Sequence, residues 1–260
     1  MVFDKQLDVF WHIIDPIHFM IYATTYIPRT IFKLISRGEY APFFSIPLFK
    51  DAWFATFWSR VGPEMRENAT PRAGPLIEQA RGVVLDIGPG SGEWLKLFDK
   101  SKITKIYGAE PNRDHHAALQ KRIKEAGLEE IYEIAPVGVE DLGDKWVGKG
   151  GVDTIVTIQC LCSVPEPKKM IEELYSYLKK GGIWVIYEHV VAYKHQGKLM
   201  KWYQAAIDIL WPHFLGGCSI TRDTVRWLEE AGEWTNVDLY QPDDEPSYHV
   251  VPHTMGVLTK

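Results

Sequence analysis

The chain has few cysteines, no cluster of basic residues and no long apolar run. The three cysteines in 260 residues, Cys160, Cys162 and Cys218, are too few for a disulfide framework and too irregularly spaced for a four-ligand zinc site. A formal net charge of -5 without clustered Lys or Arg provides no electrostatic footprint for a nucleic acid. These absences favour an intracellular protein that acts on small molecules, with no metal and no nucleic-acid partner.

Targeting signals are also missing from the N-terminal region. It lacks the basic start, short apolar core and small-residue cleavage site of a secretory signal. The charge-poor stretch at residues 16–28 is too short to span a bilayer. We therefore expect a cytoplasmic protein without a transmembrane anchor.

Two kinds of sequence share the chain, which is long enough and, at 46% hydrophobic residues, apolar enough for a sizeable core. Residues 1–72 are dense in aromatic residues and proline, whereas strand-like and helix-like segments alternate from residue 73 to residue 260. We predict an N-terminal helical extension or lid over 1–72 and an α/β domain over 73–260.

The second region predicts a mostly parallel sheet. Strands separated by helices imply right-handed crossovers and a sheet that is buried on both faces. Two C-terminal strand-like runs, NVDLYQP and PHTMGVLTK, have no helix between them and predict an antiparallel pair that completes seven strands. The other predicted strands are 82–87, 105–110, 132–137, 152–158 and 183–187, and the predicted helices are 93–99, 113–126, 166–178 and parts of 198–210 and 222–231.

A glycine turn follows the first predicted strand in the sequence VVLDIGPGSGEW. Its glycines, Gly88, Gly90 and Gly92, are spaced G-x-G-x-G, and Glu93 stands where a dinucleotide-binding turn has its third glycine. Gly88 and Gly90 allow the backbone to approach a ligand closely where a side chain would clash. An ordinary strand-to-helix turn is the alternative interpretation. The second strand ends at Glu110, at the spacing where a carboxylate meets ribose hydroxyls.

These features in this order resemble class I methyltransferases, which use S-adenosylmethionine. LKKGGIWVIYEHV resembles the fifth strand of that superfamily, and SITRDTVRWLEEAGEW, in which Thr221 is expected to cap a helix, follows in the same order. The resemblance implies a Rossmann-like fold and S-adenosylmethionine as cofactor. It also implies that Val139 and Glu140 hold adenine, although a helix cap explains the acid there equally well. The implied cofactor-binding residues are Asp86, Gly88, Gly90, Glu110, Pro111, Asn112, Val139, Glu140, Gln159 and Cys160.

Other stretches resemble the methyltransferase-like family that includes the alkyl thiol S-methyltransferases of animal membranes. This resemblance implies methyl transfer to sulfur in a small, lipophilic acceptor, with a hydroxyl as the next choice. The N-terminal region departs from the family's continuous apolar anchor because Asp15, His18, Arg29 and Lys33 interrupt it. The matching stretches are LCSV, EHV, GGCSITRDT and PHTMG, and Gln204, Asp208 and Trp211 also match.

The candidate catalytic residues are His189 and Glu188, at the end of the fifth strand. Imidazole titrates near neutral pH, so His189 is the preferred base for a thiol or phenol proton, while Glu188 is expected to orient it. A strand directs neighbouring side chains to opposite faces, so only one of them easily faces a given pocket. Both residues also allow a purely structural interpretation. Cys160 and Cys162 more often pack as small apolar side chains, and His213 and His253 are further pocket candidates.

The aromatic N-terminal region has three interpretations: a lid over the acceptor, a peripheral membrane contact, or additional core. The segment IPRTIFKLISRG is amphipathic and mildly basic, which suits a membrane surface. Two other functions stay open. One is a non-methylating reaction such as cyclisation, elimination or isomerisation with the cofactor bound, and the other is a non-catalytic subunit, against which the intact glycine turn argues. The sequence leaves the oligomeric state open.

Overall fold

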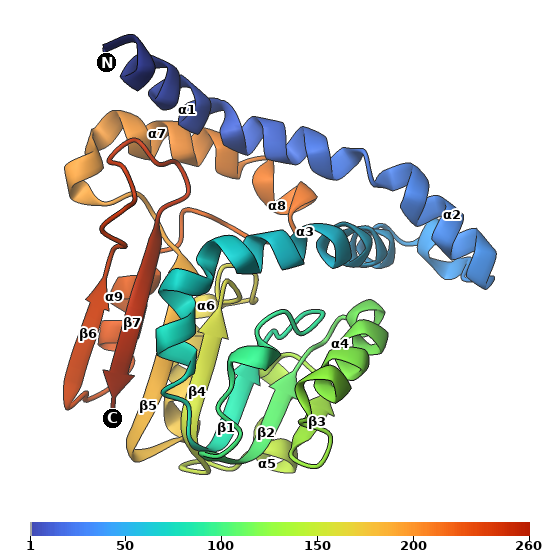
Figure 1. Ribbon diagram of the computed structural model, residues 1–260, viewed down its shortest axis with the longest axis vertical. Helices are drawn as coiled ribbons and strands as arrows, with labels where there is room; N and C mark the ends of the chain where they lie inside the picture. Colours follow the sequence, from blue (N-terminus) through green and yellow to red (C-terminus); the bar gives the residue numbers. More distant parts are fainter. Residues whose placement is uncertain (1) are drawn as a thin grey trace.

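The computed structural model describes residues 2–260 and contains one seven-stranded sheet in the order β3-β2-β1-β4-β5-β7-β6 (Figure 1). All neighbours among the first five strands are parallel, and β7 runs antiparallel to both β5 and β6. The predicted fold is confirmed. The strands are β1 (Gly82–Ile87), β2 (Ile103–Ala109), β3 (Tyr132–Ala135), β4 (Val152–Ile158), β5 (Leu178–His189), β6 (Asn236–Tyr240) and β7 (His253–Thr259).

Helices cover both faces of the sheet, as apolar central strands require. On one face, the last turns of α3 (Ile46–Ile77) pack with α4 (Arg113–Ala126) against the strands. On the other face lie α6 (Pro167–Tyr177) and α9 (Thr224–Glu230), together with the short elements η3 (Val139–Asp141) and α5 (Gly143–Trp146). The strand ends therefore remain the place where the chain can build a site.

A third layer crosses the carboxyl ends of the strands (Figure 1). It contains α1 (Val2–Thr24) and the long helix α3, which pack with two C-terminal helices around Phe57 and Trp211. Helix α3 runs through residue 72, so the division into two domains at that residue stays a prediction. The remaining elements are α2 (Ile27–Arg37), η1 (Ala41–Phe44), η4 (Lys194–Gln196), α7 (Gly197–Asp208) and α8 (Trp211–Phe214).

The helix predicted at 93–99 is wrong, because this segment forms only the single 3₁₀ turn η2 (Leu95–Leu97). Glu93 points inward and pairs with Arg122 of α4, and the Asp99 side chain accepts a hydrogen bond from the Ser101 amide at 3.1 Å. Both contacts stop the chain from continuing as a helix.

Other boundaries also differ from the prediction, such as those of β2, which begins at Ile103, and β5, which spans Leu178–His189. Strand β3 ends at Ala135, directly before Pro136, which has no amide hydrogen to donate to a ladder. Helix α9 begins after Asp223, so Thr221 does not cap it. The Thr221 hydroxyl donates instead to the Asp208 carboxylate at 2.6 Å.

Candidate active site

The glycine turn after β1 has a backbone that only glycine adopts easily. Gly88, Gly90 and Gly92 have φ values of 63°, 58° and 85°. A Cβ atom on Gly88 would lie 2.3 Å from the sulfur of Cys160, which follows the neighbouring strand β4. The turn thus needs glycine both for its conformation and for the approach of Cys160.

Glu110, one residue past β2, bridges the second strand to the glycine turn. Its two carboxylate oxygens accept hydrogen bonds from the amides of Gly90 and Asn112, each at 2.8 Å. Burial raises the pKa of Glu110 to about 7, although these two amides oppose the shift, and the Asp86 and Asp51 carboxylates add to it. A buried carboxylate beside a glycine turn is the acceptor that a pair of ribose hydroxyls requires, so the residues present fit the predicted nucleoside.

Asp86 lies near the end of β1 and accepts a hydrogen bond from the Tyr132 hydroxyl at 2.9 Å. Burial raises the pKa of Asp86 to about 7, and the tyrosine partly offsets that shift. Gly108 makes this contact possible, since a Cβ atom there would lie 2.1 Å from the Tyr132 oxygen. Asp86 is therefore a fixed carboxyl group beneath the turn, with a pKa well above that of an exposed aspartate.

The remaining cofactor candidates follow β2, β3 and β4. Asn112 caps α4 by accepting from the Asp114 amide at 3.0 Å, with Pro111 just before it. Val139 is buried in the core and Glu140 is exposed, with its carboxylate close to Gly138. The structure thus brings these residues to the predicted edge of the sheet, where their contacts with adenine stay a prediction.

Helix α3 lies over the glycine turn. The position of a Cβ atom on Gly90 is 3.5 Å from Nε1 of Trp58, and the Asn112 side-chain amide donates to the Asp51 carbonyl at 3.1 Å. The aromatic N-terminal region therefore forms part of the wall of the candidate cofactor site.

Gln159, directly after β4, joins two histidines. It has a φ of 55°, which is rare for a residue other than glycine. Its Nε2 atom lies 3.3 Å from Nε2 of His189 and 3.3 Å from Nε2 of His253. The two histidines face each other across β5 and β7, with ring centroids 4.6 Å apart. Strain at Gln159 and convergence on two imidazoles are typical of a functional site.

Glu188 and His189 point in different directions, as alternation along a strand requires. One Glu188 oxygen accepts from the amides of Cys160 and Leu161, each at 3.0 Å. Burial raises the pKa of Glu188 to about 7, although the Leu161 and Cys160 amides lower it. Glu188 thus holds the loop after β4, and among the described residues its hydrogen bonds go to that loop and not to His189.

His189 lies instead between cysteine sulfurs. Its Nδ1 atom is 3.5 Å from the sulfur of Cys218, and the sulfur of Cys162 lies in the same cluster. Strand β4 ends at Ile158, so Cys160 and Cys162 do not share a strand face. His213 lies elsewhere, with its Nδ1 atom 3.4 Å from Nζ of Lys50.

His253 is oriented by Glu245, a residue that sequence reasoning missed. The Glu245 carboxylate contacts both the backbone amide and Nδ1 of His253. Burial lowers the pKa of His253 well below its usual value, and the positive charge of Arg72 and a protonated His189 lower it further.

Known proteins share both the sequence pattern and the fold. The family described as "Methyltransferase domain" matches residues 57–239. The chain belongs to this methyltransferase family. The predicted class I methyltransferase activity and its S-adenosylmethionine cofactor are confirmed.

Two human relatives of this methyltransferase are thiol S-methyltransferases. TMT1B is 25% identical over 223 residues, which cover 82% of this chain and 88% of the relative. TMT1A is 27% identical over 202 residues, which cover 76% of this chain and 77% of the relative. Among solved structures, an O-methyltransferase family protein from Burkholderia thailandensis aligns with a TM-score of 0.62 at 12% identity, covering 96% of this chain and 71% of that one. That structural likeness shows the fold.

The methyltransferase braces its site with polar residues that sequence reasoning named only by resemblance. Gln204 of α7 accepts from the Ala192 amide at 2.8 Å and donates to the carbonyls of Val190 and Val250. Asp208 accepts from the hydroxyls of Ser219 and Thr221 and from the Ile220 amide. These bonds fix the strand end after His189 and the loop that carries Cys218.

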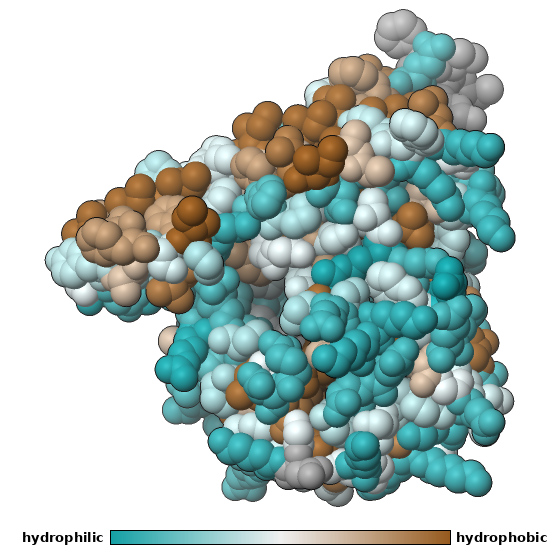
Figure 2. Space-filling view, turned by 180° about the vertical axis from the view of Figure 1, so that it is seen from behind, coloured by the Kyte–Doolittle hydropathy of each residue, from teal (hydrophilic) through white to brown (hydrophobic). Residues whose placement is uncertain are grey.

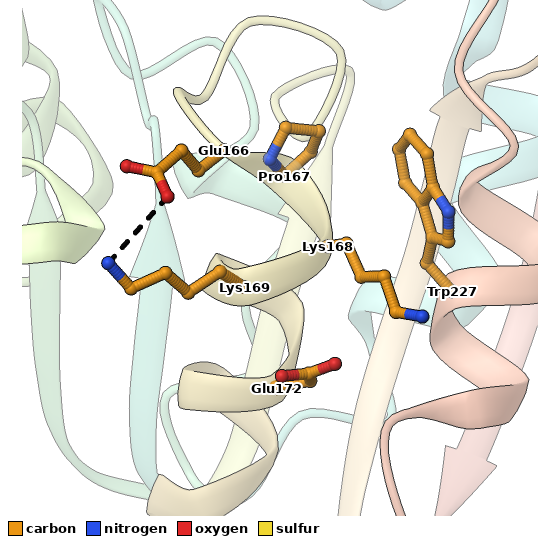
Figure 3. Close-up of a pocket in the computed structure, with 6 residues that line it drawn as sticks. All are labelled: Glu166, Pro167, Lys168, Lys169, Glu172 and Trp227. Carbon is orange, nitrogen blue, oxygen red and sulfur yellow. Dashed lines mark ion pairs between the residues drawn. The ribbon is translucent and has the colours of Figure 1, made fainter.

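A depression lies outside the site, between α6 and α9 (Figure 3). It has a volume of about 370 Å³ and is lined by two acids, two lysines, a proline and a tryptophan. Lys169 is paired there with Glu166 at 3.7 Å. None of the candidate cofactor or catalytic residues lines this depression, so it is separate from the methyltransferase site.

Proposed function

We propose that the chain transfers a methyl group to the sulfur of a small, largely apolar thiol. The observation that carries this proposal is the position of His189, a partly buried imidazole close to the carboxyl ends of β4 and β5. The human relatives named as thiol S-methyltransferases support sulfur as the acceptor atom. Oxygen is the next choice.

The surroundings of His189 favour an apolar acceptor. Cys162 and Cys218 belong to a cluster of buried side chains that also contains Phe57, Trp211 and Leu215. An apolar wall excludes water and favours a lipophilic ligand over a charged one. Helices α1 and α3 contribute to that wall, which supports the lid and core interpretations of the N-terminal region together.

Proton removal is the task of the protein in this reaction. S-adenosylmethionine, when bound, supplies a methyl group that is already activated at a sulfonium. Gln159 holds the His189 ring at one nitrogen, and Nδ1 on the other side is the group that takes the acceptor's proton. Glu188 acts as a positioning residue by fixing the backbone after Gln159.

The test is an assay with isotopically labelled S-adenosylmethionine and matched sets of small thiols, alcohols and amines. We expect labelled thioether together with an equal amount of S-adenosylhomocysteine. His189→Ala should lower kcat about 100-fold or more without changing cofactor affinity, because general base catalysis contributes about 10²–10⁴-fold. His213→Ala is the matched control. An unchanged rate and pH profile for His189→Ala would exclude this residue as the base.

We also propose that the N-terminal helices contact a membrane surface. No helix within residues 2–260 is long and apolar enough to cross a bilayer. Figure 2 nevertheless shows apolar side chains gathered on the projecting N-terminal helices. Phe32 is 73% exposed and Phe44 is 89% exposed. Large apolar side chains that are exposed together in one region mark an interaction surface.

Basic residues accompany this apolar surface on α2, where Arg29 and Arg37 are exposed. Apolar contact plus attraction to anionic lipid is the combination that holds amphipathic helices at an interface. We expect the protein to float with vesicles that contain phosphatidylserine. Phe32→Glu should reduce flotation strongly, and Glu129→Gln, at an exposed position just before β3, should not. Equal flotation of both variants would contradict the proposed contact.

A further inference from the structure

Three metal-ligating side chains from separate parts of the chain meet near the carboxyl ends of β4 and β5. Cys162 follows β4, His189 ends β5 and Cys218 follows α8. One ligand atom of each lies within 4.8 Å of the other two. Cys162 and Cys218 are only 1% and 6% exposed.

The distances within this trio suit a tetrahedral zinc ion. Zinc bonds of about 2.3 Å to sulfur and about 2.0–2.1 Å to nitrogen, at tetrahedral angles, require sulfur and nitrogen to lie about 3.5–3.6 Å apart. The Cys218 sulfur and Nδ1 of His189 lie 3.5 Å apart. The same geometry requires about 3.8 Å between the two sulfurs, which is within the 4.8 Å limit of the cluster.

Gln159 provides a second, independent observation. Its Oε1 atom is buried and has no hydrogen-bond partner among the described residues, while its Nε2 atom faces two imidazole nitrogens. Rotating the amide by half a turn places the oxygen 3.3 Å from Nε2 of His189 and of His253, so it accepts a hydrogen bond from each ring that carries a proton at Nε2. The proton then resides on Nε2, and the Nδ1 lone pair faces the two sulfurs. This arrangement is the usual support of a metal-bound histidine.

Charge also fits the metal. Two thiolates and a neutral imidazole compensate the charge of Zn²⁺, so the site as a whole is neutral in its apolar surroundings. On metal binding, each cysteine thiol releases one proton to solvent. The cluster thus needs no redox partner and no further charged residue.

We propose that Cys162, His189 and Cys218 bind a zinc ion. Three protein ligands leave the fourth position open, which is the pattern of catalytic and not of structural zinc. The trio lies close to the cofactor turn, because Cys160, two residues before Cys162, contacts Gly88.

The open fourth position allows the zinc ion to bind the acceptor thiol during methyl transfer. This role of the zinc ion rests on the proposed function. An acceptor thiol binds through its sulfur and releases its proton to solvent, so the zinc-bound thiolate is the nucleophile. Its sulfur forms the new bond to the methyl carbon, and the carbon–sulfonium bond breaks. In the zinc-loaded enzyme His189 is a ligand, and in metal-free protein it is the base.

The first experiment measures metal content, which is independent of methyl transfer. The full chain is reduced, loaded with zinc chloride, dialysed and analysed by elemental mass spectrometry. We expect about one zinc per chain. Cys162→Ala and Cys218→Ala should bind zinc at least tenfold more weakly, and Cys160→Ala is the matched control that retains it. Circular dichroism identifies any variant that has not folded. For such a variant, the cobalt absorption of the wild type replaces the comparison.

Cobalt supplies a spectroscopic readout of the ligands. We expect cobalt(II) to show intense thiolate-to-metal absorption in the wild type and in Cys160→Ala, and a further change on addition of a small thiol but not of the matching alcohol. The proposed zinc site would be overturned if the wild type held no zinc after loading, or if Cys162→Ala bound zinc as tightly as the wild type. Cobalt absorption without a thiolate band would overturn it too. A cobalt spectrum unaffected by thiol would overturn only the role of the open position. Bound zinc without thioether production would instead contradict the proposed function.

Discussion

Glu110→Gln tests how the second strand contributes to cofactor affinity. The wild-type carboxylate accepts from the amides of Gly90 and Asn112 and is mostly enclosed. Glutamine has nearly the same shape but can neither ionise nor accept at both positions. Losing hydrogen bonds to a charged group costs about 1.5–3 kcal/mol, and we expect S-adenosylmethionine to bind about 10- to 150-fold more weakly at pH 8.

The pH dependence makes this prediction specific. With a pKa of about 7, Glu110 is ionised in about one-tenth of the molecules at pH 6 and about nine-tenths at pH 8. The carboxylate form is the one that accepts ribose hydroxyls, so wild-type affinity should rise about tenfold between these values. Affinity rises with pH because deprotonation of Glu110 creates the form that binds the cofactor.

Isothermal calorimetry at pH 6, 7 and 8 measures both effects. Glu110→Gln should bind weakly and lose most of the pH dependence, whereas Glu129→Gln, on the surface, should behave as the wild type. Asp86 has a similar pKa of about 7, so Asp86→Asn separates its contribution. If the affinity of Glu110→Gln still rose tenfold between pH 6 and pH 8, Glu110 would not be the group that binds the ribose hydroxyls.

Three other substitutions test the frame around the turn. Arg122→Ala leaves the buried Glu93 carboxylate without its ion-pair partner, and urea unfolding should show a loss of about 3–5 kcal/mol. Gly88→Ala combines a φ of 63° with a side-chain clash, so calorimetry should show at least tenfold weaker cofactor binding. Tyr132→Phe removes the hydrogen bond to Asp86 and raises the pKa of that acid further above its unfolded value. Its loss of unfolding free energy should therefore be larger at pH 8 than at pH 6.

The sheet was predictable from sequence because its strands are short apolar runs between periodic helices. The glycine turn and Glu110 also came from local patterns, since their roles depend on neighbouring backbone positions. The predicted helix at 93–99 failed for a long-range reason: Glu93 pairs with Arg122, 29 residues away. Local propensity contains no information about such a partner.

The second half of the site depends even more on tertiary structure. Cys162 and Cys218 are separated by 56 residues, and Glu245 reaches His253 from an irregular loop. Cys160 and Cys162 would share a strand face only if β4 continued through both of them. The strand ends at Ile158, so the chain turns and directs Cys162 toward the loop that carries Cys218.

The placement of α3 over the glycine turn has a kinetic consequence. Nε1 of Trp58 lies 3.5 Å from the position of a Cβ atom on Gly90, so α3 leaves little room above the turn. Each exchange of cofactor for product therefore requires the Trp58 segment to separate from the turn. We expect this opening to limit the rate of turnover, so that the residence time of S-adenosylhomocysteine, and not the transfer of the methyl group, determines how fast the enzyme cycles.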